Sequence, residues 1–165
     1  MNLIDLLKKE LEFESGITRR MLSIVPADKF DWKPHPKSMN IHALASHIAE
    51  LPTWITLAVT TDGIDFASQP YVPTVLHSNA DLMKLFEASL EDGRKHLETA
   101  DTSKFEEPWI IRTGDTVHAK LNRYEVIRHA FSQVTHHRAQ MGVNLRLLNI
   151  PIPGSYGPSA DEPMM

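Results

Sequence analysis

The sequence predicts an all-α fold, a four-helix bundle, because four segments carry apolar residues at helical spacing and each begins at a capping residue. The segments run over residues 2–24, about 40–62, 78–98 and 122–148. Amphipathic helices of this length become stable when their apolar faces pack against one another. No repeat, low-complexity tract or linker divides the chain, so we expect one domain over residues 1–165.

The first predicted helix begins at Asn2, whose side chain suits an N-cap, with Asp5 three residues later, and it ends before Pro26. Its expected core face consists of Leu3, Leu6, Leu7, Phe13, Ile17, Met21 and Ile24. The following segment contains Pro34 and Pro36 and is expected to be a loop.

Ser38 or Asn40 is expected to cap the second helix, and Asp62-Gly63 to end it. The apolar stripe consists of Ile41, Leu44, Ile48, Leu51 and Ile55. Pro52 lies inside this stripe and removes one backbone hydrogen bond, so it should kink or split the helix. A proline-containing connection follows over residues 64–77.

Ser78 and Asp81 form a capping box for the third helix. Its predicted core face consists of Leu82, Leu85, Phe86, Ser89, Leu90 and Leu97. Between the third and fourth helices, apolar residues flank a turn-like Thr113-Gly114-Asp115, which predicts a short hairpin or an extended loop.

The fourth helix is expected to begin at Asn122, with Glu125 completing its cap, and to end before Pro151. Its stripe consists of Ile127, Phe131, Val134, Met141, Leu145 and Leu148.

Composition excludes several classes of function. The formal net charge is −4 and basic residues form no run, so we expect no nucleic-acid partner. The chain has no cysteine, which excludes disulfides and thiolate metal ligands and fits a reducing, cytoplasmic location. We expect no signal peptide and no membrane partner, because no apolar run approaches the ~20 residues that span a bilayer.

Nine histidines are the compositional oddity, and helical phase separates them. His47 lies between Leu44 and Leu51 on the second apolar stripe, and His137 lies between Val134 and Met141 on the fourth. Both are therefore expected to face the interior. His136 is turned by about 100° from His137, so it should point toward solvent or a helix flank.

Gln133 stands four residues before His137 and shares its face of the helix. Its amide oxygen is a weak metal ligand beside an imidazole and suits harder ions than zinc. His47, Gln133 and His137 are therefore candidate metal ligands, or else a hydrogen-bonded interior cluster without metal. Glu50, three residues after His47, is either a base near this site or a solvated surface charge.

Two stretches resemble the DinB/YfiT-like superfamily. They are WKPHPKSMNIHALASHIAELP, from Trp32 to Pro52, and RYEVIRHAFSQVTHHRAQMGVNLRLLNIPIPGSYGPSADE, from Arg123 to Glu162. The resemblance implies a four-helix bundle, frequently a homodimer, with nickel or zinc held by three histidines. Two of those histidines correspond to His47 and His137, whereas Gln133 takes the place of the third.

The resemblance also implies chemistry on a small-molecule substrate, as a thiol transferase or hydrolase whose divalent metal activates a thiol or a water. Any thiol must then arrive as a cosubstrate, since the chain has no cysteine. The tail around residues 156–159 is expected to cover such a site. The alternative is a non-catalytic, metal-free bundle that acts as a binding or stress-response protein. No catalytic residue is assigned.

Overall fold

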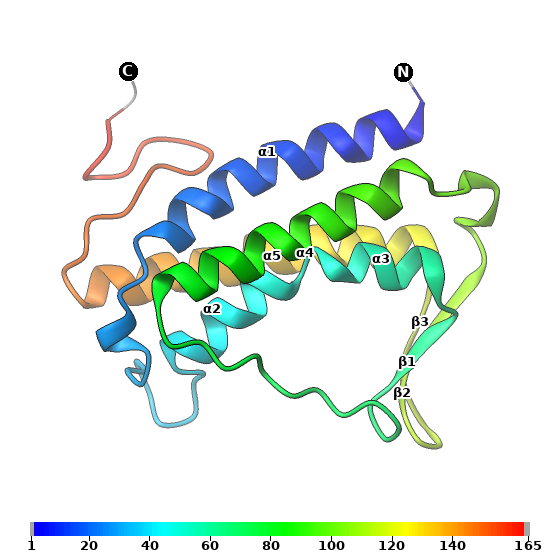
Figure 1. The fold of residues 1–165 in the computed structure, drawn as a ribbon, viewed down its shortest axis with the longest axis horizontal. Coiled ribbons are helices and arrows are strands. Elements are labelled where there is room, and N and C mark those ends of the chain that lie inside the picture. Colours follow the sequence, from blue (N-terminus) through cyan, green and yellow to red (C-terminus); the bar gives the residue numbers. More distant parts are fainter. Residues whose placement is uncertain (1, 164–165) are drawn as a thin grey trace.

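The computed structural model describes residues 2–163, and in this part of the chain five α-helices pack around one core while three strands form a small sheet (Figure 1). The helices are α1 (Leu3–Ser23), α2 (Ile41–Glu50), α3 (Thr53–Thr60), α4 (Asn79–Glu98) and α5 (Arg123–Leu147). The strands are β1 (Gly63–Asp65), β2 (Pro108–Thr113) and β3 (Thr116–Asn122). Single 3₁₀ turns lie at Ala27–Lys29 and Thr102–Lys104.

The prediction of an all-α four-helix bundle is therefore wrong in two respects: the second helix is two helices, and a mixed sheet is present. Helices α4 and α5 each pack against α1, α2 and α3. Figure 1 shows α1 along one side of this pair and α2 and α3 along the other, with the sheet at one end. No helix within residues 2–163 has the length and apolar content needed to cross a bilayer.

Pro52 divides the predicted second helix, because its ring nitrogen carries no proton for the helical ladder. The helix α2 ends at Glu50 and α3 begins at Thr53, with the Ile55 N–H donating to the Pro52 carbonyl at 3.1 Å. Figure 1 shows that the chain changes direction at this junction. The break directs α3 toward the sheet.

The predicted N-caps are present. Asn2 and Asp5 form a reciprocal capping box at α1, and Asn122 and Glu125 form another at α5. Asn40, one of the two candidates, caps α2 by accepting from the Ala43 N–H at 2.8 Å. These short-range bonds need only a polar side chain three residues from its partner, which explains why they were predictable.

The predicted core face of α1 is only partly correct. Leu7, Ile17 and Met21 are buried, but Leu3, Leu6 and Phe13 are exposed, with Phe13 58% exposed. The Phe13 ring instead stacks on Tyr156 of the C-terminal tail, with the ring centroids 6.3 Å apart.

A buried polar cluster takes the place of apolar side chains between α1 and α5. The guanidinium of Arg138, which is 2% exposed, contacts the Glu14 carboxylate at 2.8 Å and donates to the Thr18 hydroxyl at 3.0 Å. It also donates to the Tyr156 hydroxyl at 2.7 Å, and that hydroxyl donates to Glu14 at 2.8 Å. The cluster is internally hydrogen-bonded, as a buried ion pair must be if it is to persist.

The predicted hairpin is confirmed as β2 and β3, which pair antiparallel around a turn in which Gly114 has a φ of 55°. The short strand β1 was expected to be part of a connection, but it pairs parallel with β2. The buried Trp109 of β2 fastens the sheet to α3 by donating its indole N–H to the Thr61 hydroxyl at 3.1 Å.

Arg123, the first residue of α5, closes the end of α3. Its guanidinium donates to the carbonyls of Ala58 at 2.9 Å and Thr61 at 2.6 Å, which no longer have a partner within the helix. It also contacts the carboxylates of Asp62 at 2.6 Å and Glu107 at 3.0 Å. The end of α3, the sheet and the start of α5 are thereby joined by one side chain.

The close approach of α4 to the α2–α3 junction yields a test. A Cβ at Gly93 would lie 2.5 Å from the Pro52 carbonyl oxygen, so Gly93→Ala should lower the free energy of unfolding by about 1–3 kcal/mol. Gly16→Ala is the matched control, because a Cβ there meets no atom within 4 Å, and it should raise that free energy by up to about 1 kcal/mol. Urea unfolding followed by far-UV circular dichroism measures both, and equal effects of the two substitutions would contradict the close approach.

Candidate metal centre

His47 and His137 face each other between α2 and α5. Each side chain is partly buried, and the ring centroids are 4.7 Å apart with the ring planes at 81°. Residues near them on the same helices are buried, namely Leu44, Ile48, Val134 and Met141. The structure therefore brings together the two histidines that helical phase places on the interior stripes.

Gln140 selects the tautomer of His137. The Gln140 amide oxygen lies 2.9 Å from His137 Nδ1, and an amide oxygen can only accept, so Nδ1 carries the proton. The amide nitrogen of Gln140 lies 3.1 Å from Nε2 of the exposed His136 and donates to it. His137 consequently presents the lone pair of Nε2, and a hydrogen bond of this kind orients the histidine ligands of metal sites.

Burial keeps both interior histidines neutral. The pKa of His47 is lowered mainly by burial and further by the neighbouring His137, although Glu50 opposes the shift. The pKa of His137 is lowered by burial, while its hydrogen bond to Gln140 opposes the shift. Neutral imidazoles are the form that binds a cation, so these two donors fit nickel or zinc.

The third candidate, Gln133, is partly buried on α5, one turn before His137. Within residues 2–163, no group of three or more His, Cys, Asp or Glu side chains is arranged to hold a metal ion. Gln133 therefore stays a predicted third ligand, and its amide oxygen is a weaker donor than the two imidazoles. His129, a further turn away, packs against Trp54 with ring centroids 6.0 Å apart.

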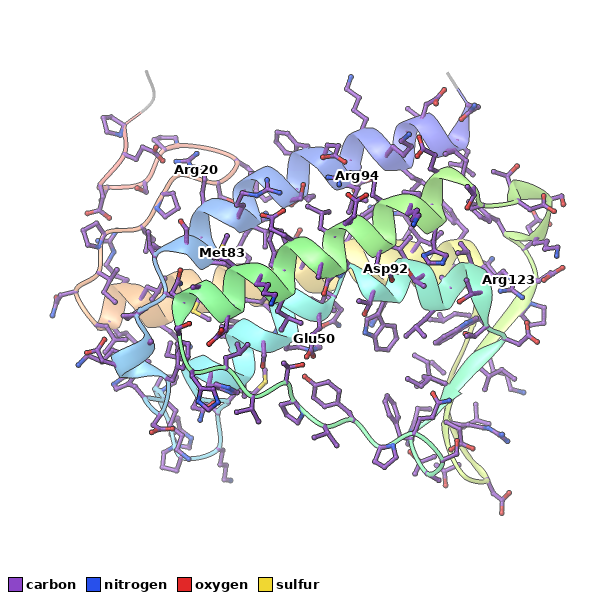
Figure 2. The ribbon with its side chains drawn as sticks, viewed as in Figure 1. Arg20, Glu50, Met83, Asp92, Arg94 and Arg123 are labelled. Atoms are coloured by element: carbon purple, nitrogen blue, oxygen red, sulfur yellow. The ribbon has the colours of Figure 1, made fainter. Side chains whose placement is uncertain are left out.

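Glu50 belongs to this region rather than to open solvent. Its carboxylate accepts from the Tyr71 hydroxyl at 2.9 Å and from the Thr74 hydroxyl at 2.5 Å. In Figure 2 the labelled Glu50 lies between α2 and the long connection that leaves β1. Burial and the bond to Glu50 raise the pKa of Tyr71, so its phenol remains a donor.

Residues 66–78, the β1–α4 segment, run from the sheet back to α4 past α2 and α3 (Figure 1). The Tyr71 ring meets the His47 ring edge to face at 6.4 Å, and the Leu76 N–H donates to His42 Nε2 at 3.0 Å. Tyr71 was missed at the sequence level, because no local pattern links a residue in a proline-containing connection to α2.

A cavity of about 510 Å³ lies between the β1–α4 segment and helices α2 and α3. His47 and Glu50 lie on its wall, so one of the two facing histidines borders a space large enough for a small molecule. The remaining lining residues are Thr53, Trp54, Leu57, Ile64, Phe66, Gln69, Pro70, Tyr71 and Val72.

The C-terminal tail does not take the place expected for it. Tyr156 contacts Glu14, Arg138 and Thr135, on the side of α5 that faces α1. The side chains that approach His47 come instead from the β1–α4 segment.

The protein is thus a helical protein with a candidate metal centre, formed by two neutral histidines that face each other between α2 and α5. The DinB family model matches residues 1–164, and the chain belongs to the DinB family. Comparison with curated proteins gives no significant match.

Solved structures share the fold. A member assigned to the DinB family from Exiguobacterium sibiricum is 20% identical with a TM-score of 0.70, covering 93% of this chain and 97% of that one. A DinB-like protein from Bacillus subtilis is 15% identical with a TM-score of 0.68, covering 97% and 99%. The mycothiol-dependent maleylpyruvate isomerase is 12% identical with a TM-score of 0.55, covering 86% and 61%. At these identities the similarity establishes the fold alone.

The buried histidines predict a pH dependence of stability. Their pKa values lie below the ordinary 6.5 in the folded chain, whereas unfolding restores that value. The unfolded state then binds more protons as pH falls, so the free energy of unfolding of the metal-free protein should decrease from about pH 7.5 to about pH 5.

Urea unfolding at several pH values measures this slope. The double variant His47→Gln/His137→Gln should flatten it, whereas the exposed His77→Gln should not. An unchanged slope in the double variant would show that these rings are not held neutral by burial.

Proposed function

We propose that this DinB-family protein is a divalent-metal-dependent enzyme that acts on a small molecule. His47 and His137 are its strong metal ligands and Gln133 is a weak third. The observation that carries the proposal is the pair of neutral imidazole rings, whose centroids lie 4.7 Å apart and of which His47 lines a cavity of about 510 Å³. Nickel and zinc suit imidazole donors of this kind.

A bound cation would lower the pKa of a thiol or water molecule, which makes thiol transfer or hydrolysis the reaction types to test. We favour a thiol, because the family's fold is shared with an isomerase described as mycothiol-dependent. The chain has no cysteine, so that thiol must be a cosubstrate.

The chain's own residues have separable roles in this proposal. Gln140 orients His137 by accepting a hydrogen bond from its Nδ1–H. Glu50 fixes the β1–α4 segment over the cavity through the hydroxyls of Tyr71 and Thr74. The apolar walls formed by Trp54, Leu57 and neighbouring side chains exclude water from a bound substrate.

A second function is a metal-free binding or stress-response protein. It is favoured by Gln133, since an amide stands where an imidazole would complete a three-histidine set. In that case His47, Gln133 and His137 are a polar interior cluster and the cavity binds a ligand without turning it over. We also propose, from the family resemblance, a homodimer in the cytoplasm.

Metal content decides between the two. Protein purified without a histidine tag and incubated with nickel or zinc should contain about one equivalent of metal per chain by elemental analysis. Less than about a tenth of an equivalent would overturn the enzyme proposal. His137→Gln should abolish binding, whereas His136→Gln, on the adjacent exposed residue, should leave the stoichiometry unchanged.

The substitution Gln133→His distinguishes a protein that binds metal weakly from one that has lost its metal site. Adding an imidazole donor should tighten an existing site by about tenfold or more in calorimetric titration with zinc or nickel. If the parent binds no metal and this variant gains both tight binding and thermal stability, the metal-free function is correct.

A further inference from the structure

The cavity beside His47 is lined by one side chain that carries a negative charge, the carboxylate of Glu50. Among the residues that line it, Glu50 is the only carboxylate, and neither lysine nor arginine is present. Arg112 of β2 lies opposite Asp65 of β1 and is ion-paired with that carboxylate at 3.2 Å. The cavity therefore offers a ligand a negative charge and no arginine or lysine partner for an anion.

Glu50 retains capacity for a further donor. One hydroxyl donor reaches each carboxylate oxygen, from Tyr71 at 2.9 Å and from Thr74 at 2.5 Å. A carboxylate has about four lone-pair sites, so two donors leave room for an ammonium N–H. The two hydroxyls also hold the carboxylate in one orientation, which reduces the ordering needed when a cation binds.

The rest of the wall suits the body of such a ligand. Trp54, Phe66 and Tyr71 contribute aromatic rings, and Leu57 and Ile64 contribute aliphatic surface. Aromatic rings attract cations through their negative faces as well as burying apolar surface. A carboxylate within an aromatic and aliphatic wall is complementary to a molecule that is apolar along its length and cationic at one end.

We infer that the cavity binds a small organic amine in its ammonium form, with the cation at Glu50 and the apolar body against Trp54, Leu57 and Ile64. The inference rests on the proposed function, because it takes this cavity as the substrate site. It adds the chemical class of the substrate and, for the metal-free protein, disfavours small carboxylates.

Three probes of similar size and different charge test it: phenethylamine, 2-phenylethanol and phenylacetate. Titration calorimetry on metal-free protein should show phenethylamine binding about tenfold or more tightly than phenylacetate, with the alcohol between them. Phenylacetate binding as tightly as phenethylamine, or no binding of any probe at millimolar concentration, would overturn the inference.

Glu50→Gln should remove most of the preference for the amine while keeping the size of the side chain. Glu106→Gln is the matched control, because Glu106 is exposed and lies outside the cavity lining, and it should leave the preference unchanged. A preference that survives in Glu50→Gln would contradict the assigned position of the cation.

Val72→Lys provides a second test that does not depend on Glu50. Val72 is 76% exposed at the cavity rim, so the substitution should leave the fold intact. The added cation should weaken phenethylamine binding and strengthen phenylacetate binding, and the opposite changes would refute the inference.

The two proposals can fail separately. Metal titration of the same protein reports on His47 and His137, whereas the probe series in the absence of metal reports on Glu50 and the cavity wall. Metal binding without a preference for the amine supports the enzyme proposal and overturns the inference about the substrate class. A preference for the amine without metal binding overturns the enzyme proposal and supports the cavity as a binding site for amines.

Discussion

The contact between Gly93 and Pro52 is the constraint on which the arrangement of the site depends. A Cβ at residue 93 would lie only 2.5 Å from the Pro52 carbonyl oxygen, so α4 can meet the α2–α3 junction only where residue 93 has no side chain. The same carbonyl accepts a hydrogen bond from the Ile55 N–H in the first turn of α3. The start of α3 is thereby fixed against α4. The direction of α3 then determines where the sheet and the β1–α4 segment lie.

Two buried arginines fasten α5 to the rest of the molecule at separate points. Arg123 binds the free carbonyls at the end of α3, and Arg138 binds Glu14 and Thr18 of α1. Buried charges are costly unless they are fully partnered, so each arginine favours one position of α5 over its alternatives. His137 lies next to Arg138 in sequence, and the position of its helix is therefore fixed from the side that faces α1.

Much of the helical architecture follows from local sequence. The capping boxes at Asn2 and Asn122, the break at Pro52 and the turn at Gly114 each depend on residues close together in the chain. The strand β1 does not, because Gly63–Asp65 is too short for an alternating pattern and pairs with residues about fifty positions later. The sheet was therefore predicted only as a hairpin, and the all-α class was wrong.

The candidate metal centre was also predictable only where its residues follow a local sequence pattern. Helical phase is sufficient to place His47 and His137 on interior stripes and His136 outside. It cannot show that Tyr71 and Thr74 reach Glu50, because those contacts depend on the path of a connection without regular structure. Nor does it separate Phe13, which lies against the tail, from the core residues of α1. The burial of Glu14 and Arg138 was missed because hydrophobic patterning treats charged residues as surface.

The β1–α4 segment is anchored at its two ends and, between them, by the hydrogen bonds of Tyr71 and Thr74 to Glu50. Its start continues from β1, and the Leu76 N–H is bound by His42, while Val72 and Val75 lie open to solvent. Doubling the length of such a loop adds only about 0.6 kcal/mol of closure entropy. Insertions between these anchors should therefore cost little folding free energy, yet each one changes the cavity beside His47. A change in the length of this segment would therefore reshape the cavity while leaving the helices and the histidine pair in place.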